Sequence, residues 1–187
     1  MSMGSRRKGN EYMREICRAL SAWVCPTWSD VTDQARLPIR VRSTSVMPVE
    51  GHWQGKGDLL HRPDFYFPFS VECKKHEAWS LDGFANKKWP VWAWWEQTCA
   101  QAGAHSGTLD TVAPMLIFSK NRFPDFVMVR QDTATWLALT AKVAPIIVLG
   151  TEGNPPVVVT TLGNLTAHPL KRPLAAKLPN SVPRRRP

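Results

Sequence analysis

Three residues in the first half of the chain, Asp58, Glu72 and Lys74, have the types and spacing needed for chemistry on a phosphodiester. Glu72 and Lys74 are separated by one residue, so in an extended strand their side chains point to the same face. Mg²⁺ prefers carboxylate and carbonyl oxygens, and an Asp on a neighbouring strand would add a second carboxylate. A metal ion held in this way activates water, and a nearby ammonium group helps to neutralise developing charge. The pattern therefore predicts a metal-dependent site for phosphodiester hydrolysis.

The stretch around Glu72 has the alternating pattern of a strand with two different faces. One face would carry Phe67, Phe69, Val71 and Cys73, and the other Ser70, Glu72 and Lys74. The first face is apolar and suited to a core, so the second is left for chemistry.

Asp58 is the expected second carboxylate, because it lies near the start of a short predicted strand over residues 57–60. The intervening chain is long enough for an antiparallel hairpin in which Asp58 meets Glu72. Asp64, in the predicted turn, is the alternative. The backbone carbonyl of Cys73 would supply a further metal ligand.

The composition narrows the class of partner. The chain has 187 residues and a formal net charge of +9 at pH 7, which favours nucleic acid. No apolar run approaches the roughly 18 residues of a membrane span, and no apolar signal-peptide region follows the polar N-terminus. We therefore expect a cytoplasmic protein that binds no membrane. The four cysteines form no Cys-x-x-Cys pair and are expected to be reduced core residues.

Hydrophobic periodicity predicts one α/β domain over residues 10–162, with a central mixed sheet flanked by helices in the order α-β-β-β-α-β. Helices are expected over 10–24, with Asn10 as N-cap, over 91–104 and over 133–140. Strands are expected over 38–46, 57–60, 67–74, 114–118, 126–129, 145–149 and 157–160. Four tryptophans crowd the start of the second helix, and one short helix cannot bury them all: Trp89, Trp92, Trp94 and Trp95.

Both ends of the chain are basic. Residues 1–9 are expected to be an N-terminal arm, and residues 163–187, rich in Pro and Arg, a disordered tail. Basic side chains in these arms and near the predicted site are candidate phosphate contacts. The candidates are Arg6, Arg7, Lys8, Lys75, Lys120 and Arg122.

The order of elements, together with Gly57-Asp58 and Val71-Glu72-Cys73-Lys74, resembles the PD-(D/E)xK nuclease core. More narrowly, three stretches resemble the archaeal-type Holliday junction resolvases and their phage relatives. These are Arg7-Lys8-Gly9, the strand from Phe67 to Lys75, and Trp95-Glu96-Gln97. The resemblance covers residues 6–130.

The resemblance implies a restriction-endonuclease-like fold and cleavage that depends on Mg²⁺, with Mn²⁺ able to substitute. It also implies a homodimer that acts on branched DNA, in the host cytoplasm if the protein is phage-encoded. The implied catalytic residues are Asp58, Glu72 and Lys74, and a Gln at position 97 contacts the site in several nucleases of this superfamily. Ser43 and Ser45 resemble the serine-bearing loop of the resolvases.

One position departs from the resolvase pattern. A first-helix Glu that helps to hold the metal is expected where this chain has Met13. Glu11 is the preferred substitute and Glu15 the second choice. A different PD-(D/E)xK nuclease, a restriction-like or nicking enzyme, and a catalytically decayed DNA-binding protein remain as alternatives. An RNA-binding or assembly protein that acts through its tail is a further one.

Overall fold

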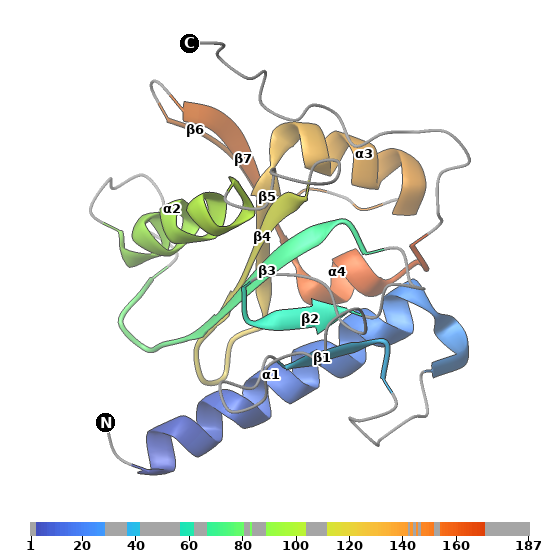
Figure 1. Ribbon diagram of the computed structural model, residues 1–187. Coiled ribbons are helices and arrows are strands. Elements are labelled where there is room, and N and C mark those ends of the chain that lie inside the picture. Colours follow the sequence, from blue (N-terminus) through green and yellow to red (C-terminus); the bar gives the residue numbers. More distant parts are fainter. Residues whose placement is uncertain are drawn as a thin grey trace, which may run out of the picture.

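The computed structural model describes residues 3–28, 37–41, 57–61, 67–80, 83, 89–103, 112–141, 143, 145, 147–151 and 154–170, without the side chains of residues 3–8, 140, 141, 150, 151, 154 and 155 (Figure 1). The helices are α1 (Met3–Val24), a short 3-10 helix η1 (Pro26–Trp28), α2 (Pro90–Gly103), α3 (Gln131–Ala141) and α4 (Leu162–Thr166). The strands are β1 (Ile39–Val41), β2 (Leu59–His61), β3 (Phe69–Lys75), β4 (Ala113–Ser119), β5 (Phe126–Arg130), β6 (Ile147–Thr151) and β7 (Asn154–Thr161).

A five-stranded mixed sheet in the order β3-β4-β5-β7-β6 forms the centre of the fold. β3 and β4 run parallel, whereas β4–β5, β5–β7 and β7–β6 are antiparallel. Every residue of β4 is buried, as expected for an apolar run with helices on both faces. β1 and β2 form a separate two-stranded sheet.

The helices divide between the two faces of this sheet (Figure 1). α1, α3 and α4 pack on the face that carries Phe69, Val71 and Cys73, around one buried apolar cluster. α2 packs on the other face, around a second cluster that includes Leu116 and Phe118. Side chains of one strand alternate between faces, so the two clusters are separated by the sheet itself. Among the described helices, none combines the length and apolarity of a membrane span.

The expected order α-β-β-β-α-β is confirmed through β4, and the later strands β6 and β7 join the same sheet. The N-terminal boundary was misjudged. α1 begins at Met3, so Asn10 lies inside the helix and is not its N-cap. The residues before it include Arg6, Arg7 and Lys8, whose straight side chains favour the helix.

The four tryptophans near the start of α2 are not all buried, as expected from the sequence. Trp89 and Trp95 are buried, whereas Trp92 and Trp94 are half-buried at the edge of the second cluster. This helix therefore presents aromatic surface to solvent as well as to the core.

The chain remains packed beyond residue 162. Thr161 caps α4 by accepting a hydrogen bond from the backbone N–H of Asn164. Leu165 is fully buried, and the backbone N–H of Leu170 donates to the carbonyl of Trp23 at 2.9 Å. The packed part thus reaches Leu170, and the remainder of the expected tail, residues 171–187, lies outside the described residues.

A matched pair of leucine substitutions tests this packing. Leu165→Ala should lower the free energy of unfolding by about 2–5 kcal/mol, because it opens a cavity against α1 and the sheet. Leu139→Ala, at a side chain that is 82% exposed, should change it by less than about 0.5 kcal/mol. Chemical denaturation measures both. Equal effects would show that residues 162–170 do not pack as described.

Candidate active site

Glu72 lies in the middle of β3 with its side chain on the face covered by α2, and it is 3% exposed. Its neighbour on that face, Ser70, is fully buried. Ser70 and Glu72 therefore share one face of β3, as expected from the sequence, but α2 covers this face. Lys74 lies closer to solvent, with 27% of its side chain exposed.

Two donors converge on one oxygen of Glu72. The ammonium of Lys74 lies 2.6 Å from Oε1, and the side-chain amide of Gln97 on α2 donates to the same oxygen at 3.0 Å. The other oxygen, Oε2, is buried and has no hydrogen-bond partner among the described residues. An unpaired buried acceptor costs on the order of 1–3 kcal/mol, more when it is charged. Oxygens of this kind are therefore candidates for a ligand.

Asp58 reaches β3 in a way that differs from the expected hairpin. β2 pairs antiparallel with β1, and the link to β3 is a single parallel bridge between Gly57 and Val71. The backbone N–H of Asp58 donates to the carbonyl of Val71 at 2.8 Å. The carboxylate of Asp58 then accepts the N–H of Cys73 at 2.8 Å. The hairpin prediction was wrong because β2 takes β1 as its ladder partner.

Gly57 makes this approach possible. Its φ of 86° lies in the left-handed region, and a Cβ at this position would lie 2.3 Å from the carbonyl oxygen of Val71. Only glycine tolerates both conditions, so the residue before Asp58 fixes where that carboxylate meets β3.

Cys73 contributes its backbone to the site. Its N–H points to Asp58, and its carbonyl points to the same edge of β3, because both groups of one residue lie on one side of a strand. The thiol instead belongs to the apolar cluster beneath α1. Burial raises the pKa of this thiol well above its ordinary value, and the charge of Asp58 raises it further. The thiol is therefore a neutral core group.

These residues fit a Mg²⁺ ion. The donor set consists of the Asp58 carboxylate and the Cys73 carbonyl at one edge of β3, and the unpartnered Oε2 of Glu72 on the face under α2. Hard oxygen ligands in this small number leave positions for water and substrate. Within the described part of the chain, no group of three or more His, Cys, Asp or Glu side chains is placed to hold a metal ion, and this donor set has only two carboxylates. An open, mostly aqueous magnesium site needs no such group.

Three of the six predicted phosphate contacts have described side chains, and all three lie where β3 and β4 end. Parallel strands end at the same edge of a sheet: Lys75 pairs with Ser119, and Lys120 and Arg122 follow Ser119 in the chain. Lys75 and Arg122 are exposed. Lys120 donates to the carbonyl of Trp79 at 3.1 Å and lies 4.1 Å from the ring centre of Phe123. The side chains of Arg6, Arg7 and Lys8 lie outside the described residues.

The first-helix carboxylates lie apart from Glu72. Glu11 and Glu15 are exposed and line a groove with Lys75 and Glu77, on the α1 side of the sheet. Met13 packs against the apolar cluster on that side. A metal role for Glu11 or Glu15 stays a prediction. Asp64, Ser43 and Ser45 lie outside the described residues.

The predicted site did not include Trp94 or His76, although the tryptophan cluster at the start of α2 was expected to be partly exposed. His76 follows Lys74 by two positions, and its ring centre lies 6.0 Å from that of Trp94. Trp94 precedes Gln97 by three positions on α2, which places both side chains on one helix face. Two spacings in the sequence indicate this arrangement. Lys74 and His76 are two positions apart, as on one face of a strand, and Trp94 and Gln97 are three positions apart, as on one face of a helix.

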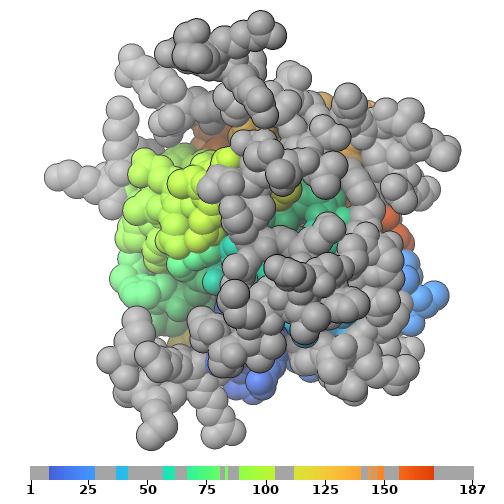
Figure 2. All heavy atoms as spheres, in the orientation of Figure 1, coloured from blue at the N-terminus to red at the C-terminus, as the bar shows by residue number. Residues whose placement is uncertain are grey.

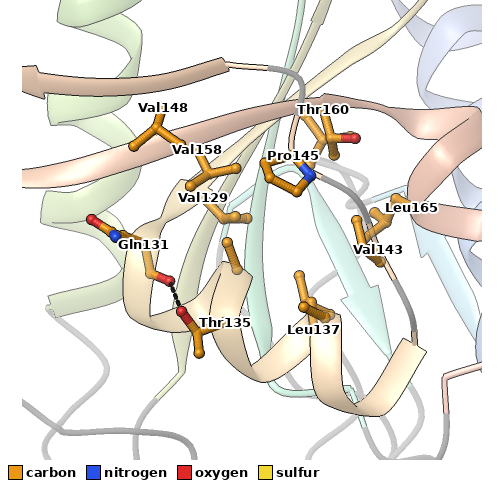
Figure 3. Close-up of a pocket in the computed structure, with 13 residues that line it drawn as sticks. Val129, Gln131, Thr135, Leu137, Val143, Pro145, Val148, Val158, Thr160 and Leu165 are labelled. Atoms are coloured by element: carbon orange, nitrogen blue, oxygen red, sulfur yellow. Dashed lines mark hydrogen bonds between the residues drawn. The ribbon is translucent and has the colours of Figure 1, made fainter.

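An apolar cavity lies elsewhere in the molecule. It has a volume of about 220 Å³ and lies between α3 and strands β5, β6 and β7 (Figure 3). Its walls include Val129, Leu137 and Val158, and the polar atoms nearby include a hydrogen bond from Thr135 to the carbonyl of Gln131 at 3.0 Å. The cavity opens on the face opposite Glu72 and lacks charged groups for phosphate chemistry.

A pair of glycine substitutions tests how Asp58 is held. Gly57→Ala should lower the free energy of unfolding by about 1–3 kcal/mol, since it combines a strained φ with a backbone clash. Gly9→Ala, within α1 and with no atom within 4 Å of the added Cβ, should be neutral or stabilising by up to about 1 kcal/mol. Thermal and urea denaturation measure both. A neutral Gly57→Ala would contradict the close approach of this segment to β3.

Comparison with known proteins agrees with this geometry. The model of one family, described as "Phage putative PDDEXK endonuclease", matches residues 4–171. No curated protein and no solved structure matches the chain. The matched region contains the Asp58, Glu72 and Lys74 constellation and nearly all of the described fold. The chain belongs to this PD-(D/E)xK endonuclease family.

Proposed function

We propose that the chain is a Mg²⁺-dependent, structure-selective DNA endonuclease that resolves four-way junctions. The observation that carries the catalytic part is the buried Glu72 carboxylate, with Lys74 and Gln97 on Oε1 and no described partner on Oε2. Asp58, tied to the next residue of the same strand, supplies the second carboxylate. The preference for branched DNA rests on the sequence resemblance to phage resolvases.

When bound, the metal ion supplies an activated water and neutralises charge that develops on the phosphate. The protein residues have separate tasks around it. Gln97 orients Glu72 through Oε1, which leaves Oε2 to the cation. Lys74 remains beside the carboxylate and near solvent, where its ammonium can orient water and offset charge on the scissile phosphate. The backbone N–H of Cys73 holds the carboxylate of Asp58 at 2.8 Å.

The charge of the molecule supports a nucleic-acid substrate. The net charge of +9 draws the phosphate backbone to the protein irrespective of sequence. Lys75 and Arg122 are exposed at the edge where β3 and β4 end, and Lys75 directly follows Lys74 in the chain. We assign them to backbone contacts. A homodimer would provide two such sites for the two strands that a resolvase must cut.

Matched carboxylate substitutions test the site. Asp58→Asn and Glu72→Gln should each lower the cleavage rate by roughly 10²–10³ or more, because each removes charge from the metal-binding set. Glu96→Gln should leave the rate unchanged, since Glu96 is exposed on α2 next to Gln97. Initial rates on labelled DNA with Mg²⁺ measure this. DNA affinity measured in EDTA should persist in all three variants, which separates catalysis from binding.

A substrate panel tests the preference for junctions. The wild-type protein with Mg²⁺ or Mn²⁺ should make paired, symmetric cuts in a mobile four-way junction and act more slowly on flap, linear duplex and single-stranded DNA. Chelation should stop all cleavage. Equal rates on linear duplex would favour a restriction-like or nicking nuclease of the same family. No cleavage of any substrate, together with no Mn²⁺ binding, would identify a decayed site.

A further inference from the structure

The polar row on β3 continues beyond the two residues already assigned. Glu72, Lys74 and His76 alternate along the same face, and His76 directly follows the end of the strand. The backbone N–H of His76 donates to the carbonyl of Ser119 at 3.0 Å, which continues the pairing with β4 past Lys75. The position of His76 is therefore set by the sheet, while its side chain is exposed.

The ring of His76 is oriented by its own turn. The backbone N–H of Ala78 donates to Nδ1 of His76 at 3.1 Å. Nδ1 is therefore the acceptor, and the neutral ring carries its proton on Nε2. An exposed Nε2–H beside Lys74 is a donor for a phosphate oxygen.

The indole ring of Trp94, on α2, lies next to the imidazole ring of His76. Its ring lies at 59° to that of His76, with 6.0 Å between centres. It is half-buried at the edge of the second apolar cluster, so part of the indole faces solvent. The segment that follows β3 and helix α2 form neighbouring parts of one surface in Figure 2 (green and yellow-green). The face of α2 that holds Gln97 against Glu72 thus also holds an indole beside His76.

The nearest acid is directed elsewhere. The carboxylate of Glu77 accepts the backbone N–H of Asn121 at 3.0 Å, in the turn between β4 and β5. Lys74 lies on the same face as His76, whereas the ammonium of Lys75 lies on the α1 side, 5.2 Å from the ring centre of Tyr12. A phosphate at His76 would therefore meet one N–H donor, the cationic side chain of Lys74 on the same face, and an aromatic wall.

We propose that His76 and Trp94 form a nucleotide-binding subsite for the residue next to the scissile phosphodiester. The Nε2–H of His76 binds the neighbouring phosphate, and Trp94 packs against the attached sugar and base. Aromatic stacking and phosphate contacts both tolerate any base, so the subsite holds DNA without reading its sequence. This subsite rests on the proposed nuclease function and names two positioning residues for it.

Two amide substitutions at His76 separate contact with DNA from support of the turn. In His76→Asn, the amide takes the place of Nδ1 and can keep the bond to Ala78, but it has no group at the position of Nε2. In His76→Gln, the amide nitrogen reaches the position of Nε2, and the bond to Ala78 is lost. The subsite predicts that Gln preserves affinity for DNA and that Asn weakens it roughly tenfold, as for a lost hydrogen bond to a charged group.

The probe is fluorescein-labelled four-way junction DNA, with affinity measured by anisotropy in Ca²⁺ or EDTA so that no cleavage intervenes. His168→Ala, at an exposed histidine after α4, is the control and should bind as the wild type does. Trp94→Phe should retain affinity, whereas Trp94→Leu should lose several-fold. Thermal melts confirm that each variant is folded.

The reverse pattern, in which Asn binds normally and Gln does not, would show that His76 acts only through its turn and would overturn the subsite. Unchanged affinity in both variants would overturn it as well. Cleavage by the wild type in Mg²⁺ is scored separately. If the wild type does not cut but the Asn and Gln variants differ as expected, His76 still binds DNA, and the nuclease proposal and the position of the subsite next to a scissile bond both fail. If the wild type cuts and these variants bind alike, only the subsite fails.

Discussion

One buried carboxylate, that of Glu72, is the group on which the rest of the site depends. Removing a charge from water costs several kcal/mol unless protein groups replace the solvent. Here the replacements are an ammonium from the same strand and an amide from α2, both bound to Oε1. A site of this kind exists only while β3 and α2 are packed together. Catalytic geometry and the stability of that interface are therefore linked, because each needs Lys74 and Gln97 in place.

The free edge of β3 shows how a second carboxylate is added at low cost. An uncovered edge strand leaves N–H and C=O groups without partners and invites association with other chains. The segment of Gly57 and Asp58 covers part of this edge with two hydrogen bonds, one to Val71 and one from Cys73. The contact that protects the strand also places Asp58 beside the strand that carries Glu72. Two carboxylates at one strand repel each other, and this repulsion favours a cation between them.

Local patterns in the sequence were enough to predict the strand and the face on which its polar side chains lie. Alternation alone placed Glu72 and Lys74 on one face of β3, and their contact at 2.6 Å follows from that spacing. The contact with Gln97 depends on how α2 is rotated over the sheet, which no local pattern specifies. Only the resemblance to nucleases of this superfamily suggested that Gln97 contacts the site. The hairpin failed for a similar reason, since the choice of β1 as the partner of β2 is made by tertiary packing.

The ends of the domain were harder to predict than its centre. Asn10 has the residue type of an N-cap, yet the helix runs through it from Met3, because propensity is a weak guide where several helix formers precede. Prolines after residue 163 suggested a tail, although Leu165 and Leu170 bury their side chains against α1 and the sheet. A few apolar residues outweigh the surrounding composition when a hydrophobic surface is available to them.

The two faces of the sheet determine from where a substrate can reach Glu72. Three helices cover one face and α2 covers the other, so a substrate has to approach at the margins of β3, where Asp58 lies on one side and the ends of β3 and β4 on another. Lys120 at the end of β4 donates to Trp79 and lies over Phe123, which fixes the turn between β4 and β5. Such packing does not neutralise its charge, so Lys120 still adds to the positive field. The same residue therefore shapes the turn and adds positive charge at this end of β3 and β4.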